Sequence, residues 1–85
     1  MKVSVRFFAA YREIVGRTHM EVGVAEGTTA GNLLDLFVGR YPRLGDLVGS
    51  SLLAVNREYV PPETTLREND EIVFVPPVSG GQTDV

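Results

Sequence analysis

The stretch EIVFVPP at residues 71–77 decides the fold of this chain, because it is a short and nearly continuous apolar run closed by two prolines. Such a run predicts a central strand over residues 71–75 that is covered on both faces or runs parallel to a neighbour. Proline lacks the backbone N–H that a strand ladder uses, so Pro76 and Pro77 end the strand.

Two further strands are predicted in the first third of the chain, where apolar and polar side chains alternate. In residues 3–7 the odd-numbered side chains are the inward ones, and in residues 19–24 the even-numbered side chains are. The segment between them, residues 9–15, is rich in helix formers and stops at Gly16, which predicts one short helix. We expect the two strands to pair as a hairpin.

The main helix is predicted from a stripe of apolar residues that recur at helical spacing, which are Ala30, Leu33, Leu34, Phe37, Val38 and Tyr41. Thr28 or Thr29 supplies the N-cap hydroxyl, and Pro42 prevents the helix from continuing. Because one side of this helix is apolar, it must cover a sheet.

The second half of the chain supplies the remaining elements. Residues 44–51 form a glycine-containing connection to a strand over residues 52–55. A turn at Asn56 and Arg57 then leads to a short edge strand at residues 59–60, since Asn tolerates a positive φ. Leu66 is an isolated apolar anchor before the last strand.

This order of elements predicts an α+β fold of the β-grasp type. A mixed sheet of about five strands carries one main helix on one face. We expect a single domain over residues 1–77 and a tail over residues 78–85.

Composition excludes several classes of function. With no Cys and one His, the chain offers no disulfide, no Cys-ligated zinc and no thiol nucleophile. Residues 1–43 carry a net charge of +2 and residues 44–85 one of −5, which argues against nucleic-acid binding. The acidic half suits a basic protein partner, the alternative being that it is simply a solvated surface. No apolar run approaches the roughly 20 residues of a membrane span, so we expect a cytoplasmic protein that does not associate with a membrane.

No catalytic constellation of known spacing is present in the sequence. His19 is expected to be an exposed strand residue. The acidic residues Glu68, Asp70 and Glu71 are interpreted as a solvated turn rather than a divalent-ion site, so no metal is expected. Phe8 and Tyr59 are candidate partner contacts because exposed aromatic side chains mark interfaces, the alternative being that each lies under a loop.

The tail carries the strongest functional signal. Gly80 and Gly81 follow the stiff proline pair, and the segment from Val78 to Gly81 extends about 13–14 Å, enough to enter a cleft of another protein. Glycine passes a narrow channel, and its carbonyl has no Cβ to hinder attack.

Three stretches carry a resemblance to a known family. They are VRFFAAYRE at residues 5–13, Asn56 before Tyr59, and LRENDEIVFVPPVSGG at residues 66–81. Together they resemble the ubiquitin-like MoaD/ThiS sulfur carriers over residues 1–81. The double proline before the tail favours the MoaD branch, which serves molybdopterin synthase.

The resemblance implies a sulfur-carrier function and no bound cofactor. An E1-like enzyme of the MoeB type uses ATP to adenylate the terminal glycine, and sulfur then displaces AMP. Gly81 would carry the sulfur as a thiocarboxylate, Gly80 would thread the channel, and Pro76, Pro77, Val78 and Ser79 would contact the partner. That partner is a MoaE-like large subunit, in a complex of two large and two small subunits, which supplies the catalytic side chains and builds the dithiolene of molybdopterin.

One departure from the family pattern is that residues 82–85 follow the second glycine, so the Gly81 carboxyl lies in a peptide bond. We expect a protease to remove these four residues; otherwise this chain is not a carrier. Two alternatives stay open. One is a carrier that supplies sulfur to cysteine, thiamine or tRNA, and the other is a ubiquitin-like modifier joined to target lysines through Gly81.

Overall fold

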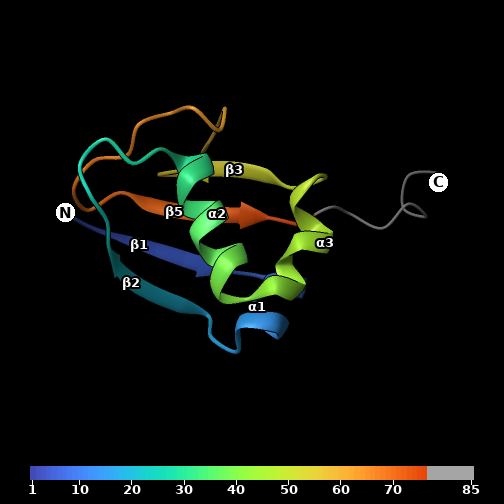
Figure 1. Ribbon diagram of the computed structural model, residues 1–85. Helices are drawn as coiled ribbons and strands as arrows, with labels where there is room; N and C mark the ends of the chain where they lie inside the picture. Colours follow the sequence, from blue (N-terminus) through green and yellow to red (C-terminus); the bar gives the residue numbers. More distant parts are fainter. Residues whose placement is uncertain (77–85) are drawn as a thin grey trace.

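The computed structural model describes residues 1–76 and builds them around one five-stranded mixed sheet, in the strand order β2-β1-β5-β3-β4 (Figure 1). The strands are β1 (Lys2–Phe7), β2 (His19–Gly23), β3 (Leu52–Val55), β4 (Glu58–Val60) and β5 (Glu71–Val75). The predicted α+β fold of the β-grasp type is confirmed. The predictions made for Pro77, Val78, Ser79, Gly80, Gly81 and residues 82–85, and the domain boundary at residue 77, lie outside the described residues.

β5 is the central strand, as its apolar run predicts. It pairs parallel with β1 and antiparallel with β3. Ile72 and Phe74 are fully buried on its helix-facing side. A parallel pair at the centre requires a crossover connection, and the chain between β1 and β5 supplies it by passing over one face of the sheet.

The link between β1 and β2 is the short helix α1 (Ala9–Val15), which ends at Gly16 with a φ of 83°. Glycine adopts this left-handed conformation without the penalty that a Cβ imposes, and its N–H donates to the Arg12 carbonyl. The chain then returns antiparallel along β1, and the even-numbered side chains of β2 face inward as predicted.

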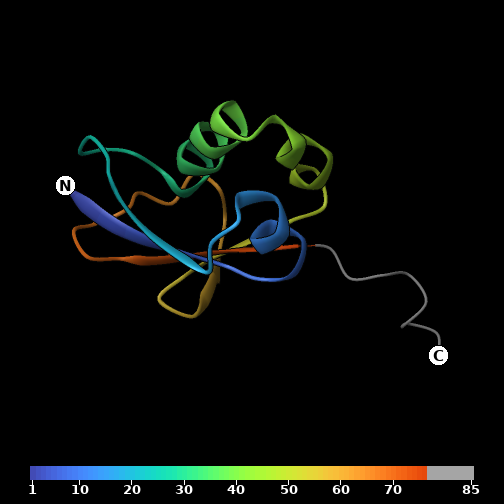
Figure 2. The ribbon, with the colours of Figure 1, turned by 90° about the horizontal axis from the view of Figure 1, so that it is seen from below.

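The main helix α2 (Ala30–Arg40) lies across the sheet and forms the second layer with the other helices (Figure 2). Thr29 is the N-cap, and it forms a reciprocal capping box with Asn32. The predicted stripe packs onto the sheet, where the Phe37 ring centroid lies 5.5 Å from those of both Phe7 and Phe74. Offset and edge-on contacts of this kind add to the apolar area that the rings bury.

The connection after α2 contains more regular structure than the sequence predicts. Residues 44–51 are expected as a plain connection, but the chain forms a 3-10 turn, η1 (Pro42–Leu44), and a one-turn helix, α3 (Gly45–Val48). The physical reason is burial, since Leu44 is 0% exposed and anchors the turn in the core. A four-residue helix is too short to leave a periodic signal in the sequence.

The predicted turn between β3 and β4 is confirmed, with φ values of 51° at Asn56 and 73° at Arg57. The Asn56 side chain donates to Asp70 Oδ1 at 2.9 Å and accepts from the Glu71 N–H at 3.0 Å. These bonds tie the turn to the start of β5. Over residues 1–76, no helix has the length and apolar character needed to cross a membrane.

Candidate functional site: the outer face of the sheet

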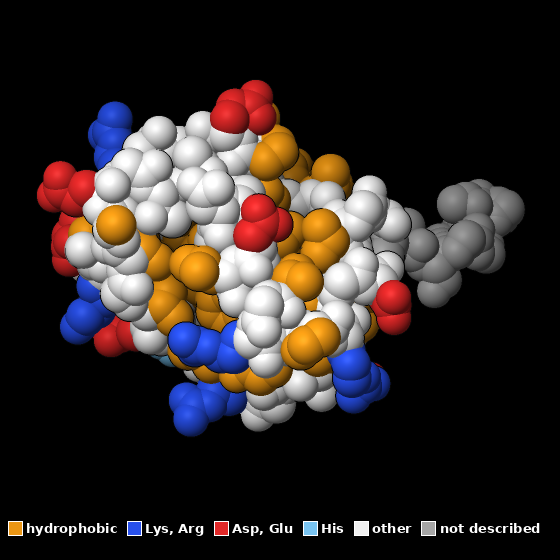
Figure 3. All heavy atoms as spheres, in the orientation of Figure 1, with side chains coloured by type: hydrophobic (Ala, Val, Ile, Leu, Met, Phe, Trp, Pro, Cys, Tyr) orange, Lys and Arg blue, Asp and Glu red, His pale blue; other side chains and the backbone are white. Residues whose placement is uncertain are grey.

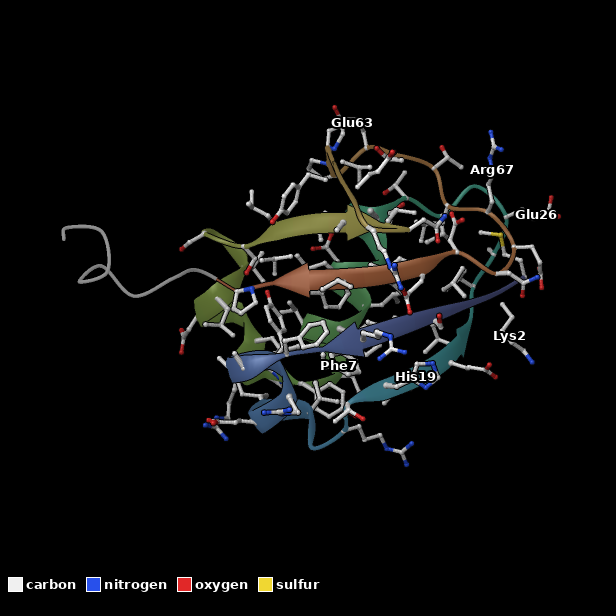
Figure 4. The ribbon with its side chains drawn as sticks, turned by 180° about the vertical axis from the view of Figure 1, so that it is seen from behind. Lys2, Phe7, His19, Glu26, Glu63 and Arg67 are labelled. Atoms are coloured by element: carbon white, nitrogen blue, oxygen red, sulfur yellow. The ribbon has the colours of Figure 1, made fainter. Side chains whose placement is uncertain are left out.

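The helices cover one face of the sheet, and the other, which we call the outer face, has none of them over it (Figure 4). Since side chains alternate along a strand, the residues on the outer face are those between the core residues. From β1 to β4 they include Ser4, Arg6, Glu71, Val73, Val75, Leu52, Ala54 and Tyr59.

Part of this face is an apolar patch, made of Phe8, Leu52, Ala54, Tyr59, Val73 and Val75. Register brings the members of neighbouring strands together: Leu52 is paired with Val75, and Ala54 with both Val73 and Tyr59. The side chains of Leu52 and Tyr59 are 56% and 70% exposed. Phe8 is also exposed, whereas Val73 and Val75 are half-buried and Ala54 is buried. Exposed apolar side chains gathered in this way indicate an interaction surface.

Phe8, a predicted partner contact, belongs to the same patch although it lies just beyond the end of β1. β1 ends at Phe7, and Phe8 is the extended N-cap residue of α1, with a φ of −127°. Because Phe7 points into the core, Phe8 points to the outer side, where it is 47% exposed and lines a shallow hollow with Val73. The alternative that Phe8 and Tyr59 lie under loops is therefore wrong for both.

The other part of the outer face is polar. Arg6 Nε donates to Glu71 Oε2 at 2.7 Å, which links β1 to β5 across their parallel pairing. An ion pair this exposed contributes at most about 1 kcal/mol to stability, so its main effect is on local geometry. Lys2 and Glu21 form a second, longer pair of 3.7 Å on this face.

The acidic residues near the last strand are each used within the fold. Glu68 accepts from the Lys2 N–H, and Asp70 accepts from the Arg67 N–H and from the Asn56 side chain. Glu71 holds Arg6. These contacts hold the turn that leads into β5. His19 is exposed and paired in register with Arg6.

The apolar patch lies at the end of the sheet where β5 finishes. Val75, the last residue of β5, is paired with Leu52, and half-buried Pro76 follows it. Because β1 and β5 are parallel, Phe7 and Phe8 lie at this same end, whereas Lys2 lies at the opposite end (Figure 4). The chain therefore enters its C-terminal segment beside the patch.

A buried hydrogen-bonded pair supports this end of the sheet from the helical side. The Tyr11 side chain is fully buried, its ring centroid lies 5.6 Å from that of Phe74, and its hydroxyl oxygen lies 2.6 Å from Ser51 Oγ. Burial raises the pKa of Tyr11 above its usual value, and the hydrogen bond with Ser51 opposes the rise in part. The hydroxyl is thus held in its neutral, donating form.

Sequence reasoning found Phe8 and Tyr59 but missed Val73, Val75 and Leu52. The signal was present in residues 71–75, because a strand whose even-numbered residues face the core must display its odd-numbered ones outward. Val73 and Val75, two half-buried valines that face outward from a central strand, are then candidates for contact with another protein.

A β-grasp domain with an apolar patch beside the end of its last strand, in a sequence that continues to Gly80 and Gly81, has the form of a ubiquitin-like carrier. The chain belongs to the ThiS family, whose model matches residues 5–81. It is 43% identical to a molybdopterin synthase sulfur carrier subunit of Mycobacterium tuberculosis, and the match covers 95% of this chain and 99% of that one.

Solved structures support the same fold. SAMP1 of Haloferax volcanii, a small archaeal modifier protein, is 29% identical, with a TM-score of 0.81 over 95% of this chain and all of that one. A chain from the complex of subunits 1 and 2 of the molybdopterin-converting factor of Helicobacter pylori is 24% identical, with a TM-score of 0.66 over 95% and 100% of the two chains.

Proposed function

We propose that this chain is the sulfur carrier subunit of a molybdopterin synthase and that it carries sulfur as a thiocarboxylate on Gly81. The single observation that supports this most strongly is the family match, which ends at Gly81 and leaves residues 82–85 beyond it. The relative from M. tuberculosis, which bears the sulfur-carrier name, spans nearly the same length.

The chemistry requires a free carboxylate at Gly81. A protease first hydrolyses the bond between Gly81 and Gln82. A carboxylate oxygen of Gly81 then attacks the α-phosphorus of ATP and expels pyrophosphate, which leaves an acyl-adenylate. Hydrosulfide adds to the acyl carbon, and AMP leaves with the electrons of the broken bond. The adenylate is needed because a carboxylate alone is a poor electrophile.

The folded domain contributes placement rather than catalysis. The apolar patch at the end of β5 would dock on a large subunit, and Gly80 and Gly81 would then reach that subunit's site through a narrow channel. Fixing the carrier beside its acceptor makes the sulfur transfer effectively intramolecular. Catalytic side chains are expected on the large subunit. The activating enzyme, of the MoeB type, catalyses the adenylation of Gly81 by ATP.

This proposal is tested by reconstitution. A variant that ends at Gly81, incubated with an E1-like activating enzyme, ATP and sulfide, should gain the mass expected for replacing one oxygen by sulfur. A matched variant that ends at Gly80 tests whether the terminal residue matters. The full-length chain should not react until residues 82–85 are removed. Equal loading of all three chains would contradict the role of Gly81.

A second candidate function, a protein modifier, is favoured by the similarity to the archaeal modifier protein. A modifier forms an amide between its terminal glycine and a lysine of a target. Peptide mass spectrometry of proteins that copurify with this chain distinguishes the two functions, because only a modifier leaves a branched peptide ending in Gly81 on target lysines.

A further inference from the structure

A groove lies on the helical side of the molecule, between α2 and the edge strand β2. Its floor and walls are apolar, and it encloses about 190 Å³; the residues that matter below are Val22, Val24, Leu33, Leu36, Phe37 and Arg40. Pockets that enclose small molecules usually measure about 300–1,000 Å³, so this groove suits amino-acid side chains better than a cofactor. Figure 3 shows hydrophobic side chains gathered over this region, with basic side chains beside them.

Leu36 makes the groove unusual for a helix surface. It is 59% exposed in the middle of α2, although the neighbouring residue Phe37 is buried in the core. A leucine at this position extends the apolar surface of α2 from the core stripe towards the open side of β2. An apolar surface that continues into a groove indicates a binding site more strongly than an isolated exposed leucine does.

The edge of β2 next to the groove offers free backbone groups. The Val24 N–H donates to Met1, and the Phe7 N–H donates to Thr18, so the even-numbered residues of this segment bond to β1. The N–H and C=O groups of His19, Glu21 and Gly23 therefore point away from β1. In the described part of the chain, no other strand pairs with this edge.

Groove and edge together have the geometry for strand addition. A segment that pairs with the free edge of β2 would lie about 4.8 Å from it, and every second side chain would face the helical side, above the groove. Backbone hydrogen bonds would then supply affinity, and the groove would select the side chains. β-Branched aliphatic residues meet both requirements, since they favour strands and fill small apolar spaces.

The charge at the groove indicates which charged group the bound segment should carry. Arg40, in the last turn of α2, lines the groove. The nearest acidic group on β2, Glu21, lies on the opposite face, where it pairs with Lys2. A carboxylate beside Arg40 is therefore complementary to this end of the groove.

We propose that the groove between α2 and β2 binds an extended segment of a partner protein, which adds to the free edge of β2. The segment places two alternate aliphatic side chains in the groove and an acidic side chain beside Arg40. This site is separate from the apolar patch, which lies on the outer face over β3, β4 and β5. It does not depend on the proposed sulfur chemistry, and the two surfaces can be occupied together.

The proposal is tested with two acetylated and amidated peptides, Asp-Thr-Val-Thr-Ile and Ile-Thr-Val-Thr-Asp, which place the acid and both aliphatic residues on one strand face in either chain direction. They are titrated into the isotope-labelled full chain and followed by amide chemical shifts. One of the two should shift the amides of His19, Glu21 and Gly23 together with those of α2. The same peptide N-methylated at its valine and at the following threonine should bind at least about tenfold more weakly, since in either chain direction one of these two N–H groups faces β2.

Two substitutions separate the groove from the outer face. Leu36→Lys and Arg40→Glu should each weaken binding about tenfold, and neither residue is buried, so the fold is retained. Tyr59→Lys, on the outer face, should leave peptide affinity unchanged. The proposal is overturned if neither peptide shifts β2 and α2, if shifts are confined to the outer face, or if N-methylation has no effect. Concentration-dependent pairing of β2 edges between copies of this chain would also overturn it.

Discussion

The hydroxyl of Tyr11 donates its hydrogen bond to Ser51, because the single proton of Ser51 Oγ is directed to the Leu47 carbonyl 2.6 Å away. The Tyr11 hydroxyl therefore joins α1 to the segment that leads into β3. Tyr11→Phe should lower the free energy of unfolding by about 1 kcal/mol at neutral pH, the usual contribution of one such bond. The exposed control Tyr59→Phe should change it by less than about 0.5 kcal/mol.

The raised pKa of Tyr11 also predicts a pH dependence with a definite sign. Above about pH 10 the unfolded chain loses the Tyr11 proton while the folded chain keeps it, so the free energy of unfolding falls as pH rises. Tyr11→Phe should remove this contribution and give a shallower decline in denaturant titrations between pH 8 and 11. Parallel profiles for the two proteins would show that burial of this hydroxyl has no such effect.

Gly31 is required where α2 meets the loop before β5. A Cβ at this position would lie 2.9 Å from Pro62 Cβ and 3.1 Å from the Pro62 carbonyl oxygen, and the Gly31 N–H donates to that same oxygen. Gly31→Ala should therefore cost about 1–3 kcal/mol in chemical denaturation. Gly39→Ala, in the same helix with nothing within 4 Å, should instead stabilise by about 0.5–1 kcal/mol. Equal effects of the two substitutions would contradict the close packing.

Asn56 combines a positive φ with two side-chain hydrogen bonds, and two substitutions separate these roles. Asn56→Gly keeps the backbone conformation and loses the bonds, which should cost about 1–2 kcal/mol. Asn56→Ala adds the left-handed backbone penalty and should cost about 1 kcal/mol more. Thermal unfolding measures both, and an alanine variant as stable as the glycine variant would argue against backbone strain at this turn.

The apolar patch should control binding to the large subunit of the synthase. Phe8→Ala and Tyr59→Ala should each weaken affinity about tenfold in calorimetry, because both side chains are exposed in the free chain and would be buried on docking. Leu36→Ala is the matched control, since Leu36 is equally apolar and 59% exposed but lies on the helical side. If Leu36→Ala weakens affinity and the two patch variants do not, the large subunit binds the helical side and the prediction is wrong.

The regular elements were predictable because their physical signals are local. The apolar run at residues 71–75, the period of two in residues 3–7 and the stripe on α2 each report one buried face. The helix α3 was not predictable, since it has only four residues and begins after Leu44, its N-cap, which is buried in the core. Its formation depends on tertiary contacts that no short window of sequence contains.

The candidate site was predictable only in part, because some of its residues are recognisable in the sequence and others only from the pairing of the strands. Exposed aromatic residues such as Phe8 and Tyr59 stand out in the sequence, whereas Val73 and Leu52 look like ordinary core residues. Alternation along residues 71–75 places Val73 on the face opposite Ile72 and Phe74, but the strand register is needed to show that it lies between Arg6 and Ala54. The proposed sulfur-bearing role of Gly81 comes from neither signal, because it concerns the chemistry of a chain end and not packing.

The most direct test of this account is the intact mass of the protein recovered from cells that make it, followed by fragmentation of the C-terminal peptide. The account predicts a chain that lacks residues 82–85 and carries one sulfur in place of oxygen on Gly81. A population that retains all four residues, with its activating enzyme present in the cell, would contradict the proposed carrier function.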